Sequence, residues 1–267
     1  MSMKAAATYV ATLLGILAGV SQRVREIIAQ PRLSAAEKLG GKKLQITWSL
    51  PAGKAFSCVG ETSVCRDGCY SKSGRHLFNS NFHKVILGNW KWLEAWRADG
   101  NIEVPAHMLA QEIITEYFRI HESGDFFAQW DVDLWTRVAE LKPHTRFWFY
   151  TRSFSLDFSK LLALPNVQGF ASCDRENKDA ARRWKARYQD LGALLAYGPW
   201  DVESQRRQFL GTGSILPQGS FLCPAVTKKI EMTAACLKCK LCLVKGRTDR
   251  DVVFLEHVST GVKRFEC

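Results

Sequence analysis

The sequence lacks low-complexity tracts, and apart from residues 5–20 it lacks any stretch approaching the roughly 20 apolar residues of a membrane-spanning helix. It also lacks a Walker A loop, a Gly-x-Gly-x-x-Gly turn, a Gly-x-Ser-x-Gly elbow and a His-Glu-x-x-His pair. These absences argue against a disordered chain and leave nucleotide hydrolysis and serine or zinc hydrolysis without support. The 267 residues present are enough for one sizeable domain with its own core.

The apolar residues 5–20 follow Lys4, a pattern that secretory signal peptides and amphipathic helices share. Apolar residues at helical spacing continue past this block, from Val10 to Ile28, and alternate there with polar residues. The pattern favours an amphipathic N-terminal helix followed by a linker, together residues 1–41. A signal peptide is the alternative.

Strand and helix patterns alternate along the rest of the chain. Six strands are expected, at residues 44–50, 118–122, 146–150, 167–172, 193–197 and 252–257. Helices are expected at residues 78–96, 105–117, 130–141, 156–164 and 178–189. This alternation predicts an α/β fold with a largely parallel sheet, either open or curved into a partial barrel. A βα core then covers residues 42–200, and a cysteine-rich extension covers residues 201–267.

Charge and cysteine content indicate partners and compartment. The chain has 37 Lys and Arg against 26 Asp and Glu, and this net charge of +11 suits a polyanion such as DNA or RNA. Of nine cysteines, seven lie in two short groups, which favours metal or cluster ligation in a reducing compartment over disulfides. We therefore expect a cytoplasmic protein that spans no membrane.

The second cysteine group carries the sharper metal signal. Cys236, Cys239 and Cys242 form a CxxCxxC motif, and Cys223 lies upstream as a candidate fourth ligand. Three thiolates on one short loop suit a [4Fe-4S] cluster, whereas structural zinc more often divides its four cysteines into two pairs. Zinc and structurally idle thiols are the alternatives.

The first group consists of Cys58, Cys65 and Cys69 in a loop directly after the first predicted strand. Three protein ligands leave one coordination position open, as in catalytic metal sites. The alternative is that a distant residue completes the set. The candidates for that residue are Cys173, Cys267 and His121.

Three further residues lie at the ends of predicted strands, where α/β folds carry their chemistry. Asp125 and Arg152 are expected to bind a ligand there, with an ion pair or a loop cap as the alternative. His121 is either a ligand or proton-transfer group, or a hydrogen-bonded core histidine.

Two segments combine cations with aromatic residues, as nucleic-acid-binding surfaces do. The first contains Trp90, Lys91, Trp92, Trp96 and Arg97, and the second contains Arg182, Arg183, Trp184, Lys185, Arg187 and Tyr188. The alternative is an ordinary helix whose tryptophans pack inward while its cations face water.

A strand leading into a three-cysteine loop with Tyr70 beside the last cysteine, followed by βα units, resembles the radical S-adenosylmethionine (SAM) superfamily. The spacing of Cys58, Cys65 and Cys69 differs from the CxxxCxxC of that superfamily. More closely, four segments resemble the phage family called gene product eighty-eight, over about residues 44–245. These segments are residues 48–53, the cysteine loop through Tyr70, residues 119–127 and residues 149–153.

The resemblance implies a radical-SAM-like partial (βα) barrel whose first loop binds a [4Fe-4S] cluster. In the superfamily a turn after the second strand holds the amino group of SAM, and Ser123, Gly124 and Asp125 occupy the matching place. The C-terminal cysteines then resemble the ligands of an auxiliary cluster. The sequence and the resemblance thus predict an iron–sulfur protein of radical-SAM-like fold. As an enzyme, it would be a SAM-dependent radical enzyme that acts on a nucleic-acid-related substrate. The alternative is a non-catalytic iron–sulfur protein of phage or mobile-element origin that binds nucleic acid.

Overall fold

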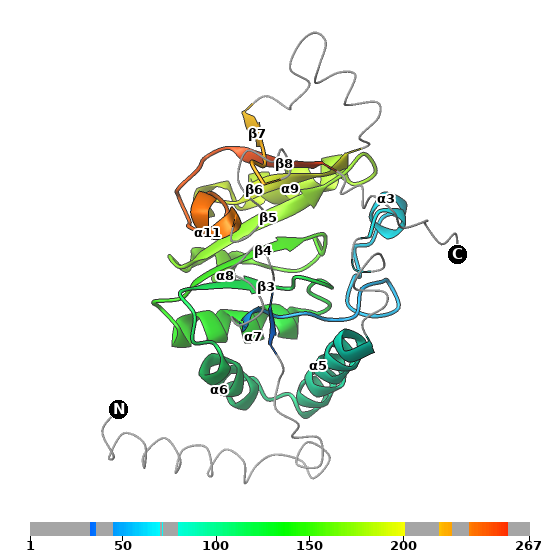
Figure 1. Cartoon of the computed structure of the whole chain (residues 1–267), viewed down its shortest axis with the longest axis vertical. Helices are drawn as coiled ribbons and strands as arrows, with labels where there is room; N and C mark the ends of the chain where they lie inside the picture. Colours follow the sequence, from blue (N-terminus) through cyan, green and yellow to red (C-terminus); the bar gives the residue numbers. More distant parts are fainter. Residues whose placement is uncertain are drawn as a thin grey trace.

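The structure is a computed structural model that describes residues 33–35, 45–69, 71, 80–200, 219–225 and 235–255. An eight-stranded sheet lies at the centre of this part of the chain, in the order β1-β2-β3-β4-β5-β6-β8-β7 (Figure 1). The strands are β1 (Ser34–Ala35), β2 (Gln45–Thr47), β3 (Tyr117–Ile120), β4 (Arg146–Thr151), β5 (Val167–Cys173), β6 (Leu194–Trp200), β7 (Ser220–Leu222) and β8 (Asp251–Leu255). Only the pair β1–β2 is antiparallel, so seven neighbouring strands form a parallel sheet.

Helices connect the parallel strands. They are α5 (Ser80–Asp99) and α6 (Glu103–Glu112) before β3, α7 (Gln129–Leu141) before β4, α8 (Ser159–Ala163) before β5, and α9 (Lys178–Arg187) with the short η3 (Gln189–Leu191) before β6. Two more helices, α3 (Ser63–Asp67) and α11 (Ala235–Cys239), lie in the two cysteine segments. Because β2 to β6 follow chain order and such crossovers are right-handed, helices α5 to α9 cover the same face of the sheet.

Strand β4 shows how the sequence builds two different layers on the sheet. Phe147 and Phe149 point into the large core formed with the helices. The alternate residues, Trp148 and Tyr150, point to the opposite face, because side chains alternate along a strand. There they meet residues of the C-terminal segment that contains α11. The strand therefore reads as a continuous apolar run, since both of its faces are covered.

The predicted α/β class with a largely parallel sheet is confirmed, and each of the six predicted strands corresponds to an observed one. The sheet also contains β1 and β7, which had not been predicted and are only two and three residues long. Strand β7 and strand β8 belong to the predicted extension of residues 201–267, yet they continue the same sheet. The predicted N-terminal helix lies outside the described residues.

Some boundaries differ from the prediction. Helix α6 begins at Glu103 and places Pro105 in its first turn, where the missing N–H of proline costs nothing. Strand β2 ends at Thr47, although the backbone N–H groups of Trp48 and Leu50 still donate to Arg119 and Ser123. The described helices include none with the length and hydropathy needed to cross a membrane.

Candidate functional site

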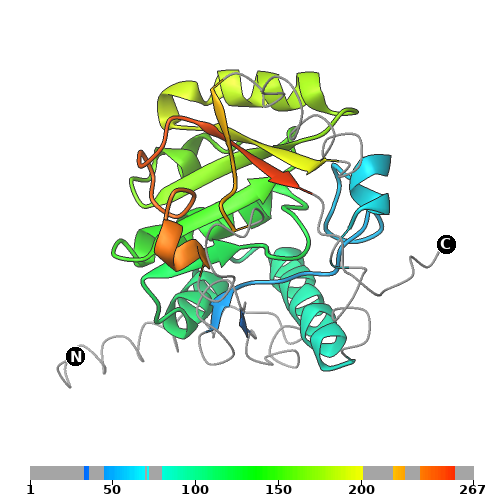
Figure 2. The same ribbon diagram turned by 45° about the horizontal axis from the view of Figure 1, so that its top comes forward.

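The first cysteine loop lies beside the carboxyl ends of the parallel strands. In both ribbon views α3 lies near the arrowheads of the sheet, whereas α11 lies toward the opposite ends of the strands (Figures 1 and 2). The loop begins at Pro51, whose carbonyl oxygen accepts a 2.7 Å hydrogen bond from the Ser57 hydroxyl. The loop thus occupies the place where parallel α/β sheets keep their reactive groups.

Thr62 fixes the middle of this loop. Its hydroxyl oxygen accepts a 3.0 Å hydrogen bond from the backbone N–H of Cys65, which caps the start of α3. The same hydroxyl donates to Oδ2 of Asp174 over 2.6 Å. Ser63 adds a second link, because its backbone N–H donates to Glu176 over 2.9 Å. The α3 segment is therefore anchored to the loop that follows β5.

The three thiols of the first group lie close enough to interact electrostatically. Burial raises the pKa of the Cys58 thiol to about 12, and the nearby Asp125, Cys65 and Cys69 raise it further. Burial likewise raises the pKa of Cys65, and the positive charge of Arg152 opposes that shift. The predicted ligands Cys58, Cys65 and Cys69 therefore converge in space, next to Asp125 and Arg152.

Ser123, Gly124 and Asp125, the predicted SAM-binding turn, pack directly against the start of the cysteine loop. The Ser123 hydroxyl donates to the Leu50 carbonyl oxygen over 2.9 Å, and the Asp125 N–H donates to the Ser57 hydroxyl over 3.3 Å. Gly124 has a positive φ of 83°, and a Cβ there would lie 2.5 Å from Ser57 Oγ. Only glycine allows this close approach without strain.

Asp125 is buried, and each of its carboxylate oxygens accepts a backbone hydrogen bond. Oδ1 accepts from Phe126 and Oδ2 accepts from Arg152, both over 2.7 Å. Burial raises the pKa of Asp125, and these N–H donors oppose the shift because they stabilise the charged form. Asp125 therefore connects the turn after β3 to the end of β4.

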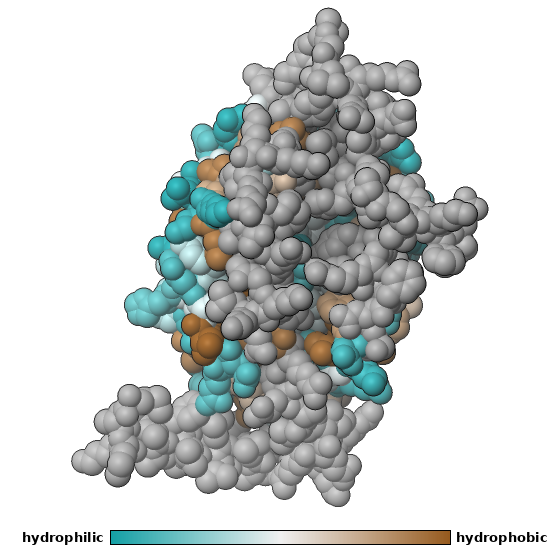
Figure 3. Space-filling model, in the orientation of Figure 1, coloured by the Kyte–Doolittle hydropathy of each residue, from teal (hydrophilic) through white to brown (hydrophobic). Residues whose placement is uncertain are grey.

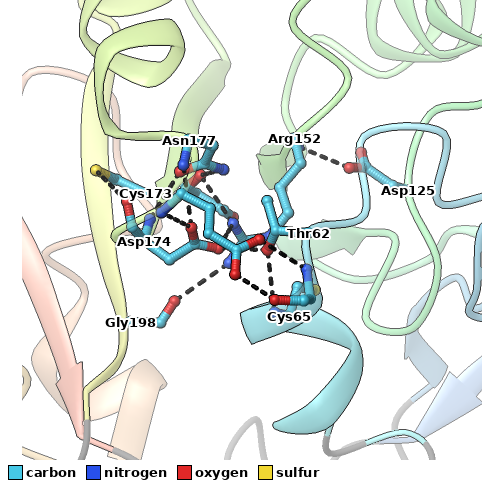
Figure 4. Close-up of polar contacts among 11 residues, drawn as sticks. Thr62, Cys65, Asp125, Arg152, Cys173, Asp174, Asn177 and Gly198 are labelled. Atoms are coloured by element: carbon cyan, nitrogen blue, oxygen red, sulfur yellow. Dashed lines mark hydrogen bonds and ion pairs between the residues drawn. The ribbon is translucent and has the colours of Figure 1, made fainter.

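Arg152 reaches from the end of β4 to the ends of β5 and β6 (Figure 4). Its Nη1 lies 2.5 Å from Asp174 Oδ2, and its Nη2 donates to the Gly198 carbonyl oxygen over 3.2 Å. The two charged side chains are only 9% and 2% exposed. Asp174 also accepts backbone hydrogen bonds from Glu176 and Asn177, so its charge is well compensated.

Of the candidates for a further ligand at the first site, His121 has a buried acidic partner. Its Nε2 lies 3.2 Å from Asp131 Oδ2, and both side chains are 0% exposed. Its ring also packs edge-on against Phe126. Cys173 is buried in the helix-side core, and burial raises its pKa to about 11. These contacts favour the interpretation of His121 as a core histidine, and Cys267 lies outside the described residues.

The second cysteine group lies on the face of the sheet opposite the helices α5 to α9. Cys236 packs on the cluster of Ile46, Tyr117, Trp148 and Leu243, and Cys223 and Cys242 pack on the neighbouring cluster around Phe170. Burial raises the pKa of Cys242, and Cys223, Cys236 and Cys239 raise it further. The four predicted ligands of the second site are thus close to one another, although Cys223 comes from a separate strand end.

None of the eight cysteines in the described ranges forms a disulfide. Within the same ranges, no three His, Cys, Asp or Glu side chains are arranged around the position of one metal ion. The neighbouring thiols that raise the pKa of Cys58 and of Cys242 nevertheless have the donor chemistry of a metal–thiolate site, since a bound metal removes the thiol protons.

Sequence reasoning missed Thr62 and Asp174, which hold the first cysteine loop in place. Both left a signal in the sequence. Thr62 lies three residues before Cys65, the spacing at which an N-cap oxygen accepts from a backbone N–H. Asp174 directly follows β5, at the end of the sheet where Asp125 and Arg152 had been singled out by the same argument.

The aromatic residues proposed to stack on nucleic-acid bases are mostly buried, which corrects that part of the prediction. Trp92, Trp96, Trp184 and Tyr188 are at most 3% exposed and belong to the core, because they face the sheet. The cations of α9 remain on the outside, and the described surface in Figure 3 is mostly hydrophilic with small hydrophobic patches. Any nucleic-acid contact on α9 would therefore involve phosphates.

Comparison with known proteins identifies relatives in bacteriophages. The family model described as Gene product 88 matches residues 22–245. The Gene 88 protein of Mycobacterium phage L5 is 29% identical over 217 residues, covering 77% of this chain and 84% of the relative. The Gene 88 protein of Mycobacterium phage D29 is 26% identical over 211 residues, covering 74% and 82%. No solved structure matches. The resemblance to the phage family is thus confirmed, and the chain belongs to the Gene product 88 family.

Proposed function

We propose that this protein is an iron–sulfur protein with a partial (βα) barrel of radical-SAM type. Cys58, Cys65 and Cys69 would hold a [4Fe-4S] cluster at the carboxyl ends of the strands. The second group, Cys223, Cys236, Cys239 and Cys242, would hold a second metal centre on the other face of the sheet. The convergence of the first three thiols beside Asp125 and Arg152 is the observation that carries the proposal.

The strand order supports the barrel. Neighbouring strands β2 to β6 follow chain order with their helices on one face, which is how (βα) barrels are built. The other face is then free to hold a ligand or a further segment. In this protein the C-terminal segment with α11 packs there, against Tyr117 and Trp148.

The donor set fits iron–sulfur ligation. A cubane binds each cysteine through a different iron, so its ligands lie farther apart than the ligands of a single ion. In the described residues, the thiols of each cysteine group lie near one another but do not surround the position of a single ion. This wider spacing is compatible with the ligands of a cubane. Zinc at the second group is the alternative, and metal analysis distinguishes zinc from iron.

The cluster at the first group, when bound, supplies the single electron that reductive cleavage of SAM requires. The chain's own residues position the reactants. Gly124 brings the turn after β3 against the cysteine loop, and Asp125 holds that turn to the end of β4. Arg152 places a positive charge beside Cys65, and it would also attract an anionic group of the cofactor or substrate. Ser123, Gly124, Asp125 and Arg152 are therefore the proposed cofactor-binding residues.

Anaerobic purification of the full chain tests this proposal. Two cubanes predict about eight irons and eight acid-labile sulfides per chain, and one cubane with zinc predicts about four irons. Addition of dithionite and SAM should then release 5′-deoxyadenosine. Protein that contains neither iron nor acid-labile sulfide would refute the cluster, and a loaded protein that leaves SAM intact would refute the enzyme.

A second candidate function is non-catalytic nucleic-acid binding by an iron–sulfur protein. Exposed Lys178, Arg182, Arg183 and Arg187 along α9 favour it, because clustered cations bind phosphates. Binding of single-stranded DNA or RNA should weaken with salt, with a slope that decreases by about 0.7 for each cation removed. Replacing Arg182, Arg183 and Arg187 by glutamine without changing affinity or slope would exclude α9 as the binding surface.

A further inference from the structure

An aromatic contact joins the first cysteine loop to α5, and the two lie side by side in both ribbon views (Figures 1 and 2). Trp92 and Trp96 of α5 are at most 2% exposed, whereas Trp90 is only partly buried. The Trp90 ring meets the Phe56 ring at 6.1 Å between centroids, with the two planes nearly perpendicular. Phe56 itself is 40% exposed. Because a perpendicular contact covers at most one face of a ring, aromatic surface remains accessible here.

The aromatic row continues from Trp90 to the turn after β3. The ring centroids of Trp90 and Phe127 lie 4.7 Å apart. The guanidinium of Arg97, which follows Trp90 by two helical turns, lies over the Phe127 ring at 5.5 Å. The cysteine loop, α5 and the turn after β3 thus bring Phe56, Trp90 and Phe127 into one row, which we call the aromatic platform.

The aromatic platform adjoins both parts of the first site. The backbone N–H groups of Phe56 and Cys58 both donate to the Gly53 carbonyl oxygen, over 2.9 and 3.1 Å, so one tight turn carries the exposed ring and the first thiol. At the other end of the row, Phe127 lies two residues after Asp125 of the turn that follows β3. A ligand on the platform would therefore lie beside the first cysteine group.

The residues at the platform have the chemistry of a base-stacking site. Accessible aromatic rings stack on unpaired nucleobases, and neighbouring cations bind the phosphates between them. Phe56 and Trp90 supply the rings, and the exposed Lys54 and Arg97 lie on the same two segments. The net charge of +11 also suits a polyanion. An apolar protein partner would gain from the rings but not from the cations.

We propose that Phe56 and Trp90 form a stacking site for an unpaired base of single-stranded DNA, and that Lys54 and Arg97 bind its phosphates. This rests on the proposed function and names the contact that would place a nucleic-acid substrate beside the first cysteine group. The side chains of phenylalanine, tryptophan, lysine and arginine contain no acceptor for a 2′-hydroxyl, so the site has no means of preferring RNA.

Binding of a short fluorescent single-stranded DNA to the full chain, purified anaerobically and followed by anisotropy, tests the site. Phe56→Leu keeps an apolar side chain but removes the ring, so Kd should rise about 5- to 150-fold at constant salt. The salt slope should stay the same, because no cation is lost. Phe56→Tyr keeps the ring and should bind like the unmodified protein. Lys54→Gln should instead reduce the salt slope by about 0.7.

Ile114→Ala is the matched control for the loss of an exposed apolar side chain. Ile114 is 84% exposed and precedes β3, so it lies toward the opposite ends of the strands from the cysteine loop. This variant should leave both Kd and the salt slope unchanged. Iron content should stay the same in every variant, because the replaced side chains are exposed and are not ligands.

Five results would overturn the proposal. The first two are no binding of DNA by the unmodified protein, and unchanged affinity in Phe56→Leu. The third is a loss of iron in Phe56→Leu, because the ring would then be structural. The fourth is weaker binding of SAM but not of DNA in Phe56→Leu, because the platform would then hold the adenine of the cofactor. The fifth is tighter binding, dependent on Phe56, of an RNA of the same sequence.

Failure of the proposed function gives a different result. Unmodified protein without iron or acid-labile sulfide would refute the cluster, whatever the affinity for DNA. Iron-loaded protein that binds DNA equally well with phenylalanine or leucine at position 56 would refute the stacking site alone. The two failures are therefore distinguishable.

Discussion

The backbone N–H of Arg152 donates to Oδ2 of Asp125 over 2.7 Å, across 27 positions of sequence. This hydrogen bond joins the turn after β3 to the end of β4. Arg152 in turn joins the end of β4 to Asp174 after β5, and Asp174 binds Thr62 of the cysteine loop. Four segments that are far apart in the chain are thereby held around the first group of thiols.

The first prediction concerns Asp125→Asn. The amide nitrogen of asparagine would face one of the two N–H donors that now bind the carboxylate, so one charge-assisted hydrogen bond is lost. We expect the free energy of unfolding to decrease by about 1.5 to 3 kcal/mol. Urea unfolding followed by circular dichroism measures it.

Asp133→Asn is the control for that variant. Asp133 lies on α7, and its Oδ1 accepts one 3.1 Å hydrogen bond from Gln129, which an asparagine oxygen can also accept. Its unfolding free energy should stay within about 0.5 kcal/mol of the unmodified protein. Equal losses in both variants would show that Asp125 has no special role in joining β3 to β4.

The sequence predicted the sheet well because its signals are local. Arg146–Thr151 carries an unbroken apolar run, and α7 carries a clear helical period. The hydrogen-bond partner of Asp125 could not be predicted in this way, because it depends on how β3 and β4 align. Nor could the burial of Trp184, since a basic helix that binds phosphate and one that only packs on a sheet have the same pattern. The strand-end rule singled out Asp125 and Arg152, which the structure joins by a hydrogen bond, and the same rule applies to Asp174.

The second prediction separates ligating from ordinary cysteines. Cys58→Ser, Cys65→Ser and Cys69→Ser should each remove the iron of the first centre, which is about four irons per chain. Cys173→Ala serves as the control, because Cys173 is buried in the helix-side core and belongs to neither cysteine group. Iron and acid-labile sulfide are measured on anaerobically purified protein. The assignment fails if Cys173→Ala loses as much iron as the other variants.

The third prediction concerns the buried pair of Arg152 and Asp174. Arg152→Ala leaves the Asp174 carboxylate buried without its cation, and should cost about 3 to 5 kcal/mol of unfolding free energy. Arg137→Ala removes a comparable contact, at 3.0 Å from Glu103, on the exposed surface. It should cost at most about 1 kcal/mol. Urea unfolding of both variants measures the contrast.

A double-mutant cycle tests the same pair more directly. Arg152→Ala and Asp174→Asn should show a coupling energy of about 0.5 to 3 kcal/mol, because residues in one hydrogen-bond network are not independent. Strict additivity of the two losses would contradict the contact. The double variant should also bind less iron at the first group, because Thr62 then loses the acceptor that holds α3.

The fourth prediction uses two glycines with opposite surroundings. A Cβ on Gly60 would lie 2.0 Å from the Arg152 carbonyl oxygen, and backbone cannot move aside as a flexible side chain does. Gly60→Ala should therefore displace the cysteine loop from the end of β4 and decrease the free energy of unfolding by about 1 to 3 kcal/mol. It should also lower the amount of iron bound by the first group. A Cβ on Gly88, within α5, meets nothing within 4 Å. Gly88→Ala should stabilise the protein by about 0.5 to 1 kcal/mol and leave iron binding unchanged, because alanine loses less conformational freedom in a helix. If both variants bound iron equally, close contact between the cysteine loop and β4 would not be what places the thiols.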